Sequence, residues 1–383
     1  MPYTLPIILL TLLLGACTNN VAKPNELVPL VGKVAINDNW QQKVGQGLGR
    51  TYRVMSPVRL GDAIYANDIA GNIFAYAADN GELLWQQALD LDIAAGVGVD
   101  SESVYVGSLD GDVVMLNRTD GLELWRVNIG SEILAPPQSN GAVVVVQTNN
   151  GELLGLDAKT GESLWDFSAT LPILTLRGTA TPLLFGDNLV AGFANGKLMA
   201  FSASDGTLFW ERRIARPQGR SDIERVVDID GQPVLAGRTL FTTSYNGTLS
   251  ALSPDGTILW SVQTSSYSSP VVINGRVFVS TEDGVMRAFD ARSGAPLWEN
   301  SSLFRRQLSA PQNLNGFVVV ADFEGYVHIF DTETGVIIAR RQIDGAGVRS
   351  PMLASNDALY VLGNNGVLAA LDIRLLDPKT LSQ

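Results

Sequence analysis

The sequence predicts an all-β fold, an eight-bladed β-propeller of four-stranded antiparallel blades whose ring is closed by the N-terminal strand. Two observations predict this fold: a repeat of about 42 residues that starts eight times, and a Trp that recurs at one position of the repeat. The 383 residues are 46% hydrophobic and 17% charged, which suits a large globular protein and excludes a disordered chain.

Each repeat contains a hairpin bounded by two glycines. The first glycine closes a turn, usually after Asn or Asp, because Asn and Gly tolerate the positive φ that such turns need. An apolar strand such as 143–147 precedes the hairpin, and a Pro commonly opens the strand before that. Four short strands per repeat are typical of a propeller blade. The hairpins begin at Gly71, Gly111, Gly151, Gly196, Gly247, Gly284, Gly325 and Gly366.

A Trp stands four residues after the second glycine in the first six repeats, and we expect it to pack between blades with its N–H on a neighbouring carbonyl. Ala339 replaces it in the seventh repeat, and the eighth repeat ends at Ile373 without a last strand. The isolated Trp40 near the N-terminus is therefore expected to lie in the strand that completes the last blade and closes the ring. The spacing agrees, since the 334 residues from Trp40 to Ile373 give about 42 for each blade.

Residues 1–16 are predicted to be a signal peptide. Residues 3–14 are mostly apolar but too few to span a bilayer as a permanent anchor, and no Lys or Arg precedes them. The only cysteine, Cys17, follows Leu14-Gly15-Ala16, a string that resembles the lipobox of bacterial lipoproteins. The resemblance implies that Cys17 is acylated and becomes the mature N-terminus; the alternative is an ordinary signal peptide with an accidental cysteine.

The remaining boundaries follow from composition. Residues 17–32 are expected to be the lipidated N-terminus and a linker, 33–374 the propeller, and 375–383 a C-terminal tail. Thr18, in place of the Asp that retains enterobacterial lipoproteins at the inner membrane, indicates the outer membrane. The net charge of −12 and the absence of a basic run argue against nucleic acid as a partner.

The segment 156–165, with Asp157, Gly161 and Trp165, resembles the tryptophan-docking repeat of quinoprotein dehydrogenases. The resemblance implies the fold, and it leaves a quinone-dependent dehydrogenase or another ligand-binding propeller as the alternative function. Quinoprotein alcohol dehydrogenases also have a vicinal Cys pair and a Ca²⁺ site with an Asp base. This chain has one Cys and no paired carboxylates with convincing metal spacing, so we expect no catalytic residue, no cofactor and no metal.

Several titratable residues have a structural interpretation. His328 aligns with residues as different as Phe74 and Arg287, which is typical of a variable strand position and indicates a structural or surface histidine. Asp290, Asp331 and Asp372 follow the third strands of their repeats and are expected to cap turns.

Two consecutive connections between repeats are enlarged. Trp165 and Pro182 are 17 residues apart, and Trp210 and Pro233 are 23 apart, against 10 to 13 in three others. The separation of 17 from Trp40 to Pro57 is Gly-rich and polar and is expected to be an ordinary turn. Equivalent connections emerge on one side of a propeller, so the two long connections should form one contiguous surface, the expected place for function.

These connections contain apolar residues beside charged ones, as protein-binding surfaces do. The alternative is that Leu174 and Leu176 tuck under the loop while Asp228 and Asp230 cap turns. The segments 174–178 (LTLRG), 222–225 (DIER) and 228–230 (DID), with the lipobox and the eight blades, resemble the BamB family, lipoprotein propellers of the outer-membrane β-barrel assembly machinery (the Bam complex).

The resemblance implies a non-enzymatic scaffold that is lipid-anchored at the periplasmic face of the outer membrane and supports insertion of β-barrel proteins. It implies binding to the periplasmic POTRA domains of BamA, and it leaves contact with unfolded outer-membrane proteins open. Carried over by position, the predicted contacts are Leu174, Leu176, Arg177, Asp228 and Asp230.

Overall fold

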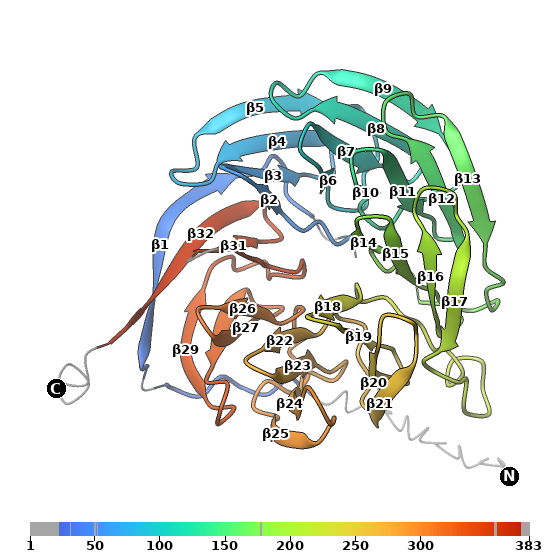
Figure 1. Cartoon of the computed structure of the whole chain (residues 1–383). Helices are drawn as coiled ribbons and strands as arrows, with labels where there is room; N and C mark the ends of the chain where they lie inside the picture. Colours follow the sequence, from blue (N-terminus) through green and yellow to red (C-terminus); the bar gives the residue numbers. More distant parts are fainter. Residues whose placement is uncertain are drawn as a thin grey trace, which may run out of the picture.

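The computed structural model describes residues 23–30, 32–49, 51, 53–176, 178–355 and 358–376. In these ranges the chain forms 32 strands arranged in eight four-stranded antiparallel sheets, which stand side by side around a ring (Figure 1). The predicted eight-bladed propeller is therefore confirmed. None of the described segments forms a helix of the length and apolar character needed to cross a membrane.

Each blade has a short inner strand and three longer strands outside it. Blades 1 to 4 contain β2 (Val58–Leu60), β3 (Ala63–Asn67), β4 (Asn72–Ala77) and β5 (Leu83–Ala88); β6 (Gly98–Val99), β7 (Ser103–Gly107), β8 (Asp112–Asn117) and β9 (Glu123–Asn128); β10 (Gln138–Ser139), β11 (Val143–Gln147), β12 (Glu152–Asp157) and β13 (Ser163–Ser168); β14 (Leu183–Phe185), β15 (Asn188–Gly192), β16 (Lys197–Ser202) and β17 (Leu208–Arg213).

Blades 5 to 8 repeat this order with one exception, since the outer strand of blade 8 comes from the N-terminus. They contain β18 (Val234–Ala236), β19 (Thr239–Thr243), β20 (Thr248–Leu252) and β21 (Ile258–Gln263); β22 (Val271–Ile273), β23 (Arg276–Ser280), β24 (Met286–Asp290) and β25 (Pro296–Asn300); β26 (Gln312–Leu314), β27 (Phe317–Ala321), β28 (Tyr326–Phe330) and β29 (Ile337–Gln342); β30 (Leu353–Ser355), β31 (Ala358–Leu362), β32 (Val367–Leu375) and β1 (Val34–Lys43).

The ring is closed by β1, which pairs antiparallel with β32 from Val34 opposite Leu375 to Lys43 opposite Val367. Trp40 in β1 donates its indole N–H to the carbonyl of Ala78 in blade 1, at 3.0 Å. The strand predicted from this isolated Trp thus completes blade 8 and joins it to blade 1.

The recurring Trp packs between neighbouring blades, as expected. Trp165 in blade 3 is 8% exposed and donates its N–H to the carbonyl of Ala203 in blade 4, at 2.8 Å. Its ring lies against Gly206, where φ is +71° and a Cβ would stand 2.7 Å from the indole. The glycine is thus required twice, for its backbone conformation and for the space it leaves. The same N–H bond to the next blade is made by Trp40, Trp85, Trp125, Trp210, Trp260 and Trp298.

The seam between blades 7 and 8 lacks this Trp, because Ala339 occupies the position. Arg341 of β29 bridges the seam instead: it donates to the carbonyl of Ile36 at 2.7 Å and pairs with the carboxylate of Asp38, both in β1. A charged side chain therefore performs at this seam the bridging that an indole performs elsewhere.

The turn-capping interpretation holds for two of the three aspartates. The carboxylate of Asp290 accepts a hydrogen bond from the N–H of Ser293 at 2.8 Å, and Asp331 accepts one from Thr334 at 2.8 Å. Asp372 differs, because it faces β1 and accepts from the side-chain amide of Asn37 at 2.9 Å. Its place on the closing seam, where no turn follows, explains the difference.

The side of the disc that carries the blade-to-blade connections also carries the turns between second and third strands. We call it the loop face. The turn residue Asn195 reaches the carbonyl of Thr170 in one connection, at 2.9 Å, and Asn246 reaches that of Val226 in the next, at 3.0 Å. Each of these two connections is thus hydrogen-bonded to the turn between the second and third strands of the blade that follows it.

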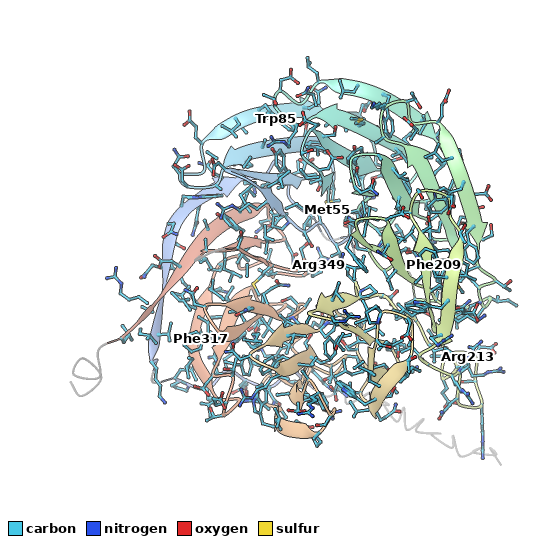
Figure 2. The ribbon with its side chains drawn as sticks, viewed as in Figure 1. Met55, Trp85, Phe209, Arg213, Phe317 and Arg349 are labelled. Atoms are coloured by element: carbon cyan, nitrogen blue, oxygen red, sulfur yellow. The ribbon has the colours of Figure 1, made fainter. Side chains whose placement is uncertain are left out.

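The connection from β1 to β2 is more than the ordinary turn expected from its Gly-rich sequence. Leu48 and Met55 are fully buried, and the guanidinium of Arg349 holds the carbonyl of Gly49 at 2.8 Å. Figure 2 shows Met55 and Arg349 near the middle of the ring. The prediction rested on the Gly-rich composition of the connection and did not take into account Leu48 and Met55, which pack inward.

Candidate functional site

The two enlarged connections are residues 169–182 between β13 and β14, here called loop A, and residues 214–233 between β17 and β18, here called loop B. In Figure 2, Arg213 marks the outer part of the ring, where β17 leads into loop B. The backbone N–H of Leu176 in loop A donates a hydrogen bond to the carboxylate Oδ2 of Asp228 in loop B. A Cβ on Gly178 would lie 2.8 Å from Asp230, so the backbone there passes close to the second carboxylate. The two loops therefore touch, as their positions in the repeat predicted.

Loop B has a short capped turn and a buried base. The carboxylate of Glu224 accepts the N–H groups of Arg220 at 2.7 Å and Ser221 at 3.1 Å, and the hydroxyl of Ser221 accepts the N–H of Glu224 at 3.3 Å. This reciprocal arrangement is that of a capping box. The base is fixed by the buried residues Val226, Val227 and Ile229. The loop is thus held in one shape by its own hydrogen bonds and by the core.

Apolar side chains are exposed on both loops. Ile173 is fully exposed, Leu174 is 43% exposed, and Ile223 at the tip of the capped turn is 73% exposed. Leu176 is half-buried. Exposed apolar residues held on an ordered loop with polar surroundings are typical of a protein-binding surface. Two other predicted site residues, Arg177 and Cys17, lie outside the described residues.

Asp228 is fully buried, so its carboxylate cannot touch a docked protein while the loops keep this arrangement. We therefore revise its predicted role from contact to positioning: it holds the backbone of loop A through Leu176, in part as the turn-capping alternative anticipated. Its Oδ1 atom has no hydrogen-bond partner among the described residues. Asp230 is partly buried and stands beside Gly178.

Burial perturbs both carboxylates. It raises the pKa of Asp228 to about 6, against the opposing effect of the hydrogen bond from Leu176. Burial first, and the charge of Asp228 second, raise the pKa of Asp230 to about 7. Since low dielectric and like charge both disfavour ionisation, the junction of the loops resists carrying two negative charges.

A small cavity of about 10 Å³ lies beneath loop A, between blades 3 and 4, with Gln147, Thr179 and Asp230 in its wall. This space holds roughly one water molecule. Over the described ranges, no group of three or more His, Cys, Asp or Glu side chains could hold a metal ion.

His328 occupies a buried position in β28 rather than a surface one. It is 0% exposed, and its Nε2 atom lies 2.9 Å from the carboxylate of Asp322, which is also buried. Desolvation lowers the pKa of His328, against the raising effect of Asp322. The structural role anticipated for this residue agrees with these contacts, but its partners were not visible in the repeat pattern.

Sequence reasoning missed Ile173 and Ile223, the two most exposed large apolar residues of the loops. Both have a local signal. Ile173 directly follows Pro172 in a segment without strand alternation, and Ile223 stands within Ser221–Glu224, whose spacing is that of a capping box. An apolar residue inside a capped surface turn is exposed by that turn.

Known proteins similar to this chain match it over most of its length. The family model described as outer membrane protein assembly factor BamB matches residues 69–253 and 234–374. The chain is 46% identical over 369 residues to that factor of Pseudomonas aeruginosa, covering 95% of this chain and 97% of the relative. It is 30% identical over 383 residues to that of Escherichia coli K12, covering 96% and 98%.

Solved structures show the same relationship. The crystal structure of BamB from Moraxella catarrhalis superposes with a TM-score of 0.82 at 28% identity, covering 88% of this chain and 100% of that chain. A quinohemoprotein alcohol dehydrogenase from Comamonas testosteroni has a TM-score of 0.70 at 13% identity, a likeness of fold alone. The chain therefore belongs to the BamB family of outer membrane protein assembly factors.

Proposed function

We propose that this chain is a non-enzymatic scaffold lipoprotein of the β-barrel assembly machinery, and that loops A and B bind the periplasmic POTRA domains of BamA. The observation that carries the proposal is the joined pair of loops, with apolar side chains exposed on an ordered backbone. Membership of a family named for outer membrane protein assembly supports it. Acylation of Cys17 would hold the propeller at the periplasmic face of the outer membrane.

In this proposal the loop residues have different roles. Ile173, Leu174 and the half-buried Leu176 supply apolar contact, and fully burying such a side chain contributes roughly 1.5–3 kcal/mol. Arg177 supplies a charged rim to the surface. Asp228 holds the backbone of loop A in place through Leu176, and the partly buried Asp230 remains a proposed contact. Contacts of this kind, few and central, dominate binding energy in most protein interfaces.

The test is co-purification of BamA with the full lipoprotein from outer membranes. Replacing Leu174 by Glu places a charge in the proposed contact and should remove BamA from the purified sample. Leu122→Glu, in the turn between β8 and β9 on the opposite face of the disc and 60% exposed, is the matched control and should retain it. Undiminished BamA with Leu174→Glu would contradict the site.

The non-enzymatic part has its own test. Pyrroloquinoline quinone added to the purified protein should produce no stoichiometric change in absorbance. A saturating one-to-one change would favour the dehydrogenase-like alternative instead.

A further inference from the structure

The segment before β1 runs along the outer side of blade 7 instead of leading straight away from the ring. Figure 1 shows it in blue beside β29 and β25. At one end, Asn25 donates its backbone N–H to the carbonyl of Phe304 and its side-chain amide to that of Ser301, both at 3.0 Å. At the other end, the N–H of Lys33 donates to the carbonyl of Ile338 in β29, at 2.9 Å. Both ends of the segment are therefore hydrogen-bonded to blades 6 and 7.

Two arginines hold the segment between these ends. Arg306 donates from Nη1 to the carbonyl of Asn25, and Arg340 donates from Nη1 to the carbonyl of Val28, both at 3.1 Å. Each guanidinium thus bonds to a backbone carbonyl of the segment. These two bonds therefore do not require particular side chains at positions 25 and 28.

The arginines are themselves fixed by the buried charged cluster of blade 7. Arg306, 2% exposed, donates from Nε to the carboxylate of Asp322 at 2.7 Å and pairs with Glu324. Arg340 donates from Nε to Nδ1 of His328 at 3.2 Å, so the Nε2–H of His328 faces Asp322. The cluster therefore preorganises both guanidinium groups toward the segment.

Apolar contacts accompany these hydrogen bonds, and we call the two sets of contacts together the clamp. Leu27 and Leu30 are partly buried and pack against the core cluster that contains Leu303, Leu308 and Ile337. Their neighbour Val28 is 61% exposed. The segment thus behaves as an amphipathic strip, with Leu27 and Leu30 on the blades and the two residues between them in solvent.

We infer that this clamped segment sets the orientation of the disc, with the rim at blades 6 and 7 toward a lipid bilayer. The inference rests on the proposed acylation of Cys17. The chain leaves the clamp at Asn25, which is bonded to the connection between blades 6 and 7 on the loop face. Eight residue steps separate Cys17 from Asn25, a reach of at most about 29 Å. A fixed exit and a short reach bring this rim, and no other, to the bilayer.

The chemistry of the rim fits a bilayer surface. Val28 and Val336 are exposed, at 61% and 54%, and the guanidinium of Arg305 stands over the ring of Phe304, 5.4 Å from its centre. Apolar side chains with a neighbouring cation suit the boundary between headgroups and acyl chains. In this inference the buried charged cluster of blade 7 orients the protein on the membrane, in addition to stabilising the blade.

The test uses the full lipoprotein reconstituted in vesicles of phosphatidylethanolamine and phosphatidylglycerol that contain nitroxide-labelled lipid. A fluorophore is attached through Ser302→Cys at the blade 6 to 7 connection, or through Asp110→Cys on the loop face of blade 2, across the ring. Quenching should be strong at position 302 and weak at position 110. Equal quenching at both positions would overturn the orientation.

A paired variant separates the clamp from the lipid anchor. Leu27→Ser with Leu30→Ser should leave the protein on floated vesicles but remove the difference in quenching between the two positions. Loss of the parent protein from the vesicles would instead contradict the acylation. Hydrogen exchange of the same lipoprotein in detergent checks the clamp without a bilayer: the amide of Asn25 should be protected, and exchange at the rate of a free peptide would overturn the clamp.

Discussion

The backbone N–H of Leu176 donates a hydrogen bond to the buried carboxylate of Asp228, 52 residues further along the chain. This bond ties loop A to loop B, the connections that precede and follow blade 4. A surface made of two loops can be specific for one partner only if the loops keep a fixed relationship, and this bond together with the contact of Gly178 with Asp230 provides it.

Replacing Asp228 by Ala should release loop A while leaving the blades intact. The amide of Leu176 loses its acceptor, so its hydrogen exchange should accelerate at least about tenfold, which corresponds to about 1.4 kcal/mol of local opening. Asp228→Asn is the control, because its side-chain carbonyl can still accept the bond. Unchanged exchange at Leu176 in the Ala variant would show that the bond does not hold the loop.

The raised pKa of Asp230 predicts a dependence of stability on pH. The folded-state pKa of about 7 lies above the unfolded value, so the contribution of this group is fully present below about pH 4 and is lost as the pH rises through 7. Asp230→Asn cannot ionise and escapes that loss. Between pH 5 and pH 8, the free energy of unfolding of the variant should therefore rise relative to that of the parent by on the order of 2–3 kcal/mol.

Urea unfolding midpoints at pH 5, 6, 7 and 8 measure this difference. Asp110→Asn, an exposed change on blade 2, is the control and should run parallel to the parent. A difference between Asp230→Asn and the parent that stays constant with pH would show that Asp230 ionises freely in the folded protein.

The packing of Trp165 on Gly206 predicts unequal effects of two glycine substitutions. Gly186→Ala and Gly206→Ala both place a side chain at positive φ, at +62° and +71°, which costs about 1–2 kcal/mol. A Cβ at 186 meets nothing within 4 Å, whereas one at 206 meets the indole of Trp165 at 2.7 Å. Gly206→Ala should therefore lose about 1–3 kcal/mol more, seen in thermal unfolding. Equal melting temperatures would mean that the indole yields without cost.

Much of the fold was predictable because its regularity is local. Trp and Gly recur at a fixed spacing, so the one Trp outside the series, Trp40, identified the closing strand. The failures are non-local. Asp372 resembles a turn-capping residue in its own repeat, yet it faces β1, whose pairing joins the two ends of the chain.

The candidate site was predictable in place but less so in its details. An interrupted repeat located loops A and B and indicated that they meet. Which residues point outward depends on how each loop folds on its neighbours, so Asp228 was expected as a contact although it is buried. The clamp on residues 23–30 was hidden for the same reason: a segment with no period and two prolines was interpreted as a linker, while its partners Arg306 and Arg340 lie some 280 and 310 residues away.

The central claim, that loops A and B are the surface that meets BamA, is tested most directly by site-specific photocrosslinking in cells. A photoreactive phenylalanine analogue is placed at Leu174, at Ile223 or at the exposed control position Leu122 of blade 2. The account predicts a crosslink to the POTRA domains from positions 174 and 223 and none from position 122. A crosslink to BamA from position 122 alone would contradict it.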